Sequence, residues 1–112
     1  MDKPIFNLIT LKEAKDFLTS LPDNVREKML YNIRKVRFGV KDDNLFKKLG
    51  DSDIWEFRTS LQGMAYRLFA FWDKEGETLV IATHGIIKKT QKTPKREIDK
   101  AIAIRKEWFN NK

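Results

Sequence analysis

Apolar residues recur at two periods along the chain, and the change of period predicts the order of elements. The short apolar run at residues 5–9 (Ile-Phe-Asn-Leu-Ile) fits a first strand. From residue 11 onward, apolar positions follow at steps of three and four, which predicts a helix along Leu11, Ala14, Phe17, Leu18 and Leu21. Pro22 then suits the first turn of a second helix, and Gly39 is a plausible stop signal for it. The apolar stripe of this second helix comprises Val25, Met29, Ile33 and Val36. Two helices with little chain between them predict a helical hairpin.

The second half of the chain follows a period of two, which predicts strands. In residues 54–60, positions 55, 57 and 59 point one way, and the polar positions 56, 58 and 60 point the other. Residues 64–72 are apolar on both faces except at Arg67, as expected of a central strand, and residues 78–87 predict a further strand. Short connections between these three strands predict an antiparallel meander.

A final helix is predicted after the Thr93-Pro94 pair. Thr93 can cap this helix, and Pro94 fits its first position. Its apolar stripe should pack on the sheet and comprises Ile98, Ala101, Ile102, Trp108 and Phe109. The whole order predicts an α+β sandwich with its helices gathered mainly on one face of the sheet. Because the chain has no repeats or linkers, we expect residues 1–112 to form a single domain.

The charge balance narrows the kind of partner. The 112 residues include 23 basic and 16 acidic side chains, a net charge of +7 that favours a polyanion such as nucleic acid or an acidic protein. A generally basic, solvated surface is the alternative. The absence of cysteine excludes disulfides and cysteine nucleophiles, and a single histidine excludes a histidine-rich metal site. Without a signal-peptide core or membrane-length apolar run, we expect a soluble cytoplasmic protein and no membrane partner.

The positive charge is concentrated near the C-terminus. Residues 88–106 hold eight basic and two acidic side chains, which accounts for nearly the whole net charge. Lys95 and Arg96 fall in the first turn of the predicted helix, where the helix dipole disfavours cations. Cations placed against the helix dipole indicate a functional surface, here one suited to phosphates. The simpler alternative is a solvated helix end.

Three polar residues in apolar strands are candidates for chemistry. Arg58 and Arg67 each need a partner or an open groove. Either Glu56 pairs with one of them, or both lie on an uncovered sheet face and clamp a phosphate. His84 is either a hydrogen-bonded structural residue or the one ordinary acid/base group of the chain. Trp55 and Trp72 could stack on bases, but their strand spacing favours core packing.

What the sequence lacks also limits the chemistry. No glycine-rich phosphate loop, paired metal-binding carboxylates or nucleophile elbow is present. These residues therefore predict phosphate electrostatics and positioning, with no cofactor and no metal. That chemistry suits RNA, because the ribose 2′-OH is a built-in nucleophile.

Several motifs together resemble the RelE/ParE superfamily of toxins, most closely its HigB-like, phage-derived branch. These are a strand ending in Trp55-Glu56-Phe57-Arg58, a strand centred on Tyr66-Arg67, the strand end Thr83-His84-Gly85-Ile86, and the run of residues 88–94 (KKTQKTP) followed by Glu97-Ile98. The similarity spans essentially the full chain, and the lysine–threonine–proline run is its specific part. It implies a RelE-like fold with an N-terminal strand, a two-helix hairpin, an antiparallel meander and a C-terminal helix.

The resemblance also implies a function. It implies the toxin of a type II toxin–antitoxin system, which cleaves mRNA, commonly in the ribosomal A site, and is neutralised by a helix-turn-helix antitoxin. By position, Arg58 and Arg67 would bind phosphate and stabilise the transition state, and Lys88, Lys89 and Lys92 would contact RNA.

Other roles stay open at this point. Lys95 and Arg96 extend the expected phosphate-binding surface, and His84 and Lys88 are the candidates for proton transfer. Two alternatives remain for the function. One is a non-enzymatic gyrase inhibitor like the ParE relatives, and the other is a basic nucleic-acid-binding module without activity.

Overall fold

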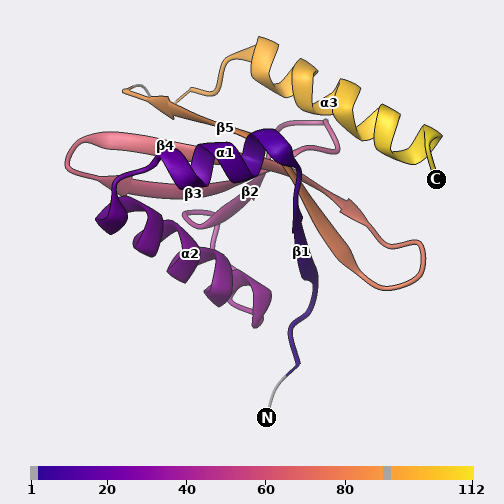
Figure 1. Ribbon diagram of the computed structural model, residues 1–112, viewed down its shortest axis with the longest axis horizontal. Helices are drawn as coiled ribbons and strands as arrows, with labels where there is room; N and C mark the ends of the chain where they lie inside the picture. Colours follow the sequence, from indigo (N-terminus) through magenta and orange to yellow (C-terminus); the bar gives the residue numbers. More distant parts are fainter. Residues whose placement is uncertain (1–2, 90–91) are drawn as a thin grey trace.

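The computed structural model describes residues 3–89 and 92–112, which form eight helices and strands within those ranges (Figure 1). In chain order these are β1 (Asn7–Thr10), α1 (Lys12–Ser20), α2 (Asp23–Arg37), β2 (Phe46–Lys48), β3 (Trp55–Leu61), β4 (Met64–Asp73), β5 (Leu79–Lys88) and α3 (Lys95–Asn110). The predicted α+β class and order of elements are confirmed. None of the described helices is long and apolar enough to cross a membrane.

The strands form one five-stranded sheet in the order β1-β5-β4-β3-β2. β3, β4 and β5 pair antiparallel, so the predicted meander is confirmed, and β4 is its central strand. β1 pairs with β5 in parallel. A parallel pair needs a long connection, and here the two helices and strands β2 to β4 lie between the two strands in the chain. β2, which the sequence pattern did not predict, pairs with residues 55–57 of β3 only. Beyond that short pairing, β3 lies at the edge of the sheet.

The helices cover both faces of the sheet. α1 and α2 pack on the face that carries Phe57 and Leu68, whereas α3 packs on the face that carries Phe69 and Phe71. In Figure 1, α1 and α2 lie close together and α3 lies apart from them. The expected gathering on one face therefore holds for α1 and α2 and is wrong for α3. An apolar stripe fixes that a helix packs on a sheet, but not on which face.

The helix ends follow local chemistry. Gly39 has φ +101° and follows the end of α2, where its N–H and that of Val40 bond to the carbonyls of Val36 and Lys35. These two bonds make a Schellman motif, so the predicted stop is confirmed. The predicted cap on α3 is wrong. α3 begins at Lys95, no side chain caps it, and the Thr93 hydroxyl instead donates to Glu56.

Gly85 lets α1 approach the sheet. It lies next to an irregularity in the pairing of β4 and β5, between Leu68 and Ala70. A Cβ built on Gly85 would lie 2.2 Å from the ring of Phe17 in α1, far inside van der Waals contact. The absence of a side chain at this position is therefore a packing requirement.

We predict that Gly85→Ala destabilises the protein by about 1–3 kcal/mol, because the added methyl group displaces the Phe17 ring. Urea unfolding measures the loss. In the Phe17→Leu background the same substitution should cost less, since the smaller side chain leaves room for the methyl group. An equal cost in both backgrounds would contradict this packing account.

Candidate functional site

Two arginines lie directly opposite each other at the centre of the meander. Arg58 of β3 pairs in register with Arg67 of β4, on the face that α3 covers. Like charges at such a position repel. Glu56 lies on the same face two residues earlier, and its Oε2 is 3.3 Å from Arg58 Nε and 3.4 Å from Arg67 Nε. Neither contact has hydrogen-bond geometry, so each is an ion pair only. One carboxylate therefore separates and holds both guanidinium groups.

The second oxygen of the same carboxylate connects this pair to the segment before α3. Thr93 Oγ1 donates to Glu56 Oε1 over 2.8 Å, and Lys88 Nζ donates to Thr93 Oγ1 over 2.9 Å. Lys88 lies at the end of β5, opposite Ala65. We call Glu56, Arg58, Arg67, Lys88 and Thr93 the charge cluster. It joins β3, β4, β5 and the start of α3.

Most of the charge cluster is buried. Arg67 is 1% exposed, Glu56 2% and Lys88 8%, whereas Arg58 is only partly buried. The uncovered sheet face expected for the arginines is therefore wrong at Arg67, because Glu56 and the packing around it enclose this guanidinium. The ion-pair interpretation is confirmed, and it applies to both arginines.

Burial shapes the electrostatics of the cations. It lowers the pKa of Arg67, an effect that Arg58 reinforces and Glu56 opposes. It also lowers the pKa of Lys88, again opposed by Glu56 and reinforced by the two arginines. Three cationic side chains thus surround one carboxylate. An anion that approaches them meets an excess of positive charge with little solvent to screen it.

A cavity of about 340 Å³ lies at the edge of β3, where it opens to the partly exposed Arg58, and its lining also includes the buried Arg67. The pairing of β3 with β2 stops at Phe57, and Arg58 Nη1 donates to the carbonyl of Asp43, in the loop before β2, over 3.1 Å. The lining includes Lys28 and Asn32 of α2, Asn44 of the loop, Arg58 and Thr59 of β3, and Arg67 of β4. We call this cavity the edge pocket. Among the described residues no carboxylate lines it.

Sequence reasoning missed part of this site. The spacing of Glu56 and Arg58, two residues apart on one strand, could have placed them together on one face. Asn32 and Asn44 carry no such signal. They come from a helix and a loop whose relation to β3 arises only in the folded chain.

His84 lies apart from the edge pocket. Its Nδ1 is 2.9 Å from Thr83 Oγ1, its Nε2 is 3.2 Å from Glu97 Oε1, and its ring lies against Phe69. Burial lowers the pKa of His84, the nearby Lys100 lowers it further, and Glu97 opposes both. Both ring nitrogens thus have protein partners, an arrangement suited to holding α3 on the sheet.

The remaining predicted cations lie at the surface. Lys89, Lys92, Lys95 and Arg96 are exposed, in the segment that leads into α3 and in its first turn. Lys95 pairs with Asp99 at 3.2 Å and Arg96 with Glu97 at 3.6 Å. The structure thus brings Arg58, Arg67 and Lys88 together, whereas the four exposed cations lie outside the charge cluster, on the surface near the start of α3. The core-packing interpretation of Trp55 and Trp72 is confirmed, since both pack against the aromatic core.

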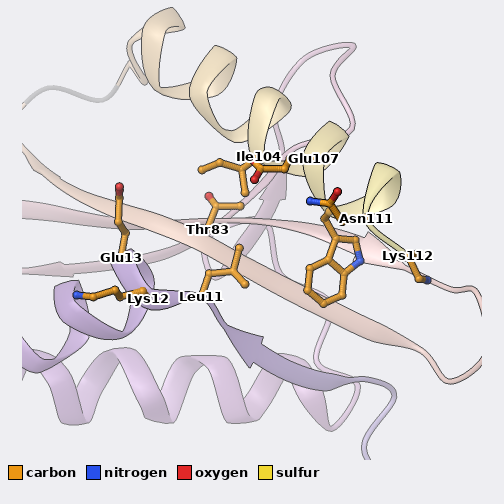
Figure 2. Close-up of a pocket in the computed structure, with 9 residues that line it drawn as sticks. Leu11, Lys12, Glu13, Thr83, Ile104, Glu107, Asn111 and Lys112 are labelled. Carbon is orange, nitrogen blue, oxygen red and sulfur yellow. The ribbon is translucent and has the colours of Figure 1, made fainter.

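A second and larger cavity, of about 490 Å³, lies beside α3. Figure 2 shows Ile104 of α3 above Thr83 and Leu11, and Asn111, the residue after α3, beside them; these residues line the cavity together with Trp108. None of the predicted site residues lines this cavity. Among the described residues, no group of three acidic or histidine side chains could hold a metal ion.

The fold, the basic charge and the charge cluster define a small, basic α+β protein with a largely buried arginine pair. The family described as "Phage derived protein Gp49-like (DUF891)" matches residues 16–106, and the chain belongs to this family. It is a RelE/HigB-like toxin family, so membership implies an antitoxin partner. No curated protein matches the chain.

We predict that Glu56→Gln destabilises the fold by about 3–5 kcal/mol, because it leaves Arg67 buried without a countercharge. Urea unfolding measures the change. The matched control is Thr93→Val, which removes the hydrogen bond to the same carboxylate but no charge and should cost about 1–3 kcal/mol. If Glu56→Gln unfolds like the wild type, the carboxylate does not hold the arginines.

We predict that the single histidine titrates below pH 6.5, because burial and Lys100 disfavour its charged form. Since the pKa is lower in the folded chain, the neutral ring stabilises the fold above pH 6.5. That contribution is lost as the pH falls through the folded-state pKa. Proton NMR of the imidazole ring follows the titration. Lys100→Met should raise the midpoint and the exposed Lys106→Met should not, whereas a wild-type midpoint above 6.5 would refute the assignment.

Proposed function

We propose that the protein is an mRNA-cleaving toxin whose arginine pair binds the scissile phosphate. The observation that carries this proposal is the charge cluster, in which Arg58 and Arg67 face each other beside Lys88 and border an acid-free pocket. Guanidinium groups match the geometry of phosphate oxygens, and a partly buried pair binds them more strongly than a solvated one. Membership of the Gp49-like family supports the assignment as a toxin. The arginine pair is the reason for proposing RNA cleavage as its activity.

The reaction proposed is transesterification by the RNA itself. The 2′-OH attacks the adjacent phosphorus and gives its proton to water, while the bond to the 5′ oxygen breaks and that oxygen takes up a proton, which leaves a 2′,3′-cyclic phosphate and a 5′-OH. The protein aligns the phosphate and stabilises the additional negative charge of the transition state through Arg58 and Arg67.

Lys88 is the better placed of the two candidates for proton transfer. Its ammonium group belongs to the charge cluster, and its lowered pKa favours release of a proton to the leaving 5′ oxygen. Both ring nitrogens of His84 already face protein partners. In this proposal His84 supports α3, and Lys88 assists the chemistry.

The surface cations and the partners complete the proposal. Lys89, Lys92, Lys95 and Arg96 would contact neighbouring phosphates of the RNA, where each solvated pair adds affinity that falls with salt. The ribosome would supply mRNA in a fixed geometry, which compensates for weak acid/base groups. A helix-turn-helix antitoxin would neutralise the protein.

We predict that Arg58→Ala lowers the mRNA cleavage rate by roughly 100-fold or more, because one transition-state donor is lost. The Arg58→Ala/Arg67→Ala double variant should abolish growth arrest after induction. RNA-end mapping counts the cuts, circular dichroism checks the fold, and the exposed Lys106→Ala is the matched control. A folded double variant that keeps full toxicity would contradict the proposed site. DNA damage without RNA cuts by the wild type would contradict the proposed reaction.

A further inference from the structure

The edge pocket contains polar groups that the phosphate chemistry does not use. Asn32 is only 7% exposed, although an amide in such a position must have its hydrogen bonds satisfied or offered to a ligand. Asn44 is exposed at the rim on the loop side. Both lie on elements outside the meander.

The orientation of the Asn32 amide is fixed by its neighbours. Its Nδ2 donates to Thr59 Oγ1 over 3.1 Å, and the Thr59 hydroxyl donates to the Met29 sulfur over 3.4 Å. Because Thr59 uses its own proton on sulfur, its oxygen accepts from Asn32, which assigns the nitrogen of the amide to this side. No donor among the described residues reaches Asn32 Oδ1. Asn32 therefore offers the edge pocket one oriented acceptor.

In each arginine of the edge pocket, some of the guanidinium nitrogens have protein partners and one does not. In each, Nε faces Glu56 and Nη1 donates to a backbone carbonyl, that of Asp43 for Arg58 and that of Tyr66 for Arg67. Within the described part of the chain, neither Nη2 donates to a protein acceptor. Arg58, Arg67 and Asn32 thus line a single cavity, and each keeps one polar side-chain atom without a partner among the described residues.

We propose that the edge pocket binds one nucleotide of single-stranded RNA, with its phosphate on Arg58 and Arg67 and its base at Asn32 and Asn44. This inference rests on the proposed function and adds base recognition to it. The cavity, about 340 Å³, is at the lower end of the range for small-ligand sites. A fixed acceptor selects a base edge with an N–H donor, and mismatched polar groups are strongly rejected when they are buried.

The acceptor predicts which bases bind. Adenine, cytosine and guanine carry an exocyclic amino group that can donate to Asn32 Oδ1. Uracil has one edge N–H between two carbonyl oxygens, which face the amide oxygen unfavourably. Uridine should therefore bind most weakly.

The test is an NMR titration of the full ¹⁵N-labelled chain with AMP, CMP, GMP, UMP and inorganic phosphate in turn. We expect the Asn32 and Asn44 side-chain signals to shift, and at least one amino-bearing nucleotide to bind about tenfold more tightly than UMP or phosphate, as one hydrogen bond allows. Asn32→Ala should remove the preference and Asn44→Ala should weaken binding. Asn110→Ala, an exposed amide on α3, is the matched control.

Equal binding of all four nucleotides and phosphate would overturn the inference, as would a preference that survives Asn32→Ala. If Asn32→Ala does not fold, the ranking by the wild type and the effect of Asn44→Ala decide. The proposed function fails separately, through the absence of RNA cuts on ribosomes while nucleotides still bind. RNA cuts without nucleotide binding in the edge pocket overturn this inference alone.

Discussion

The rest of the site depends on the ion pairs that the Glu56 carboxylate makes with Arg58 and Arg67. The register of β3 and β4 places Arg58 opposite Arg67, an arrangement that would destabilise the sheet without a countercharge. Glu56 supplies that charge to both. Its other oxygen accepts from Thr93, so the same group also fixes the approach to α3. Removal of one charge therefore affects the sheet, the arginines and the connection to the last helix together.

Burial of the charge cluster costs desolvation free energy, and it also strengthens the attraction of the cluster for an anion. Charges removed from water are expensive, and a single carboxylate compensates three cations only in part. The remaining positive charge acts on any anion that reaches it, and with weak screening that attraction is strong. The edge pocket borders Arg58 and Arg67 at the point where the pairing of β3 with β2 stops and β3 has no further partner strand.

Much of the fold was predictable from periodicity, because alternation and helical spacing are local properties. The meander, the helical hairpin and the Gly39 stop all follow from residues within a few positions of one another. The parallel pairing of β1 with β5 and the side of the sheet that α3 covers depend on contacts between distant segments. β2 was missed because three residues are too few to show a period.

The site was predictable only in its strand residues. Arg58 and Arg67 stood out as charges in apolar strands, and the resemblance to the HigB-like toxins added Lys88. The burial of Arg67 follows from the register and from Glu56, neither of which a linear pattern contains. Thr93 was misassigned because a helix cap and a carboxylate partner require the same hydroxyl.

The most direct test of the proposed chemistry uses an mRNA that carries a single 2′-deoxy substitution at the nucleotide before the cut, programmed into purified ribosomes. We expect the wild-type protein to leave this message intact and to cut the all-ribose message to a 2′,3′-cyclic phosphate and a 5′-OH. Cleavage of the deoxy-substituted message at the same position and rate would contradict this expectation, because the arginine pair would then be assisting a different nucleophile.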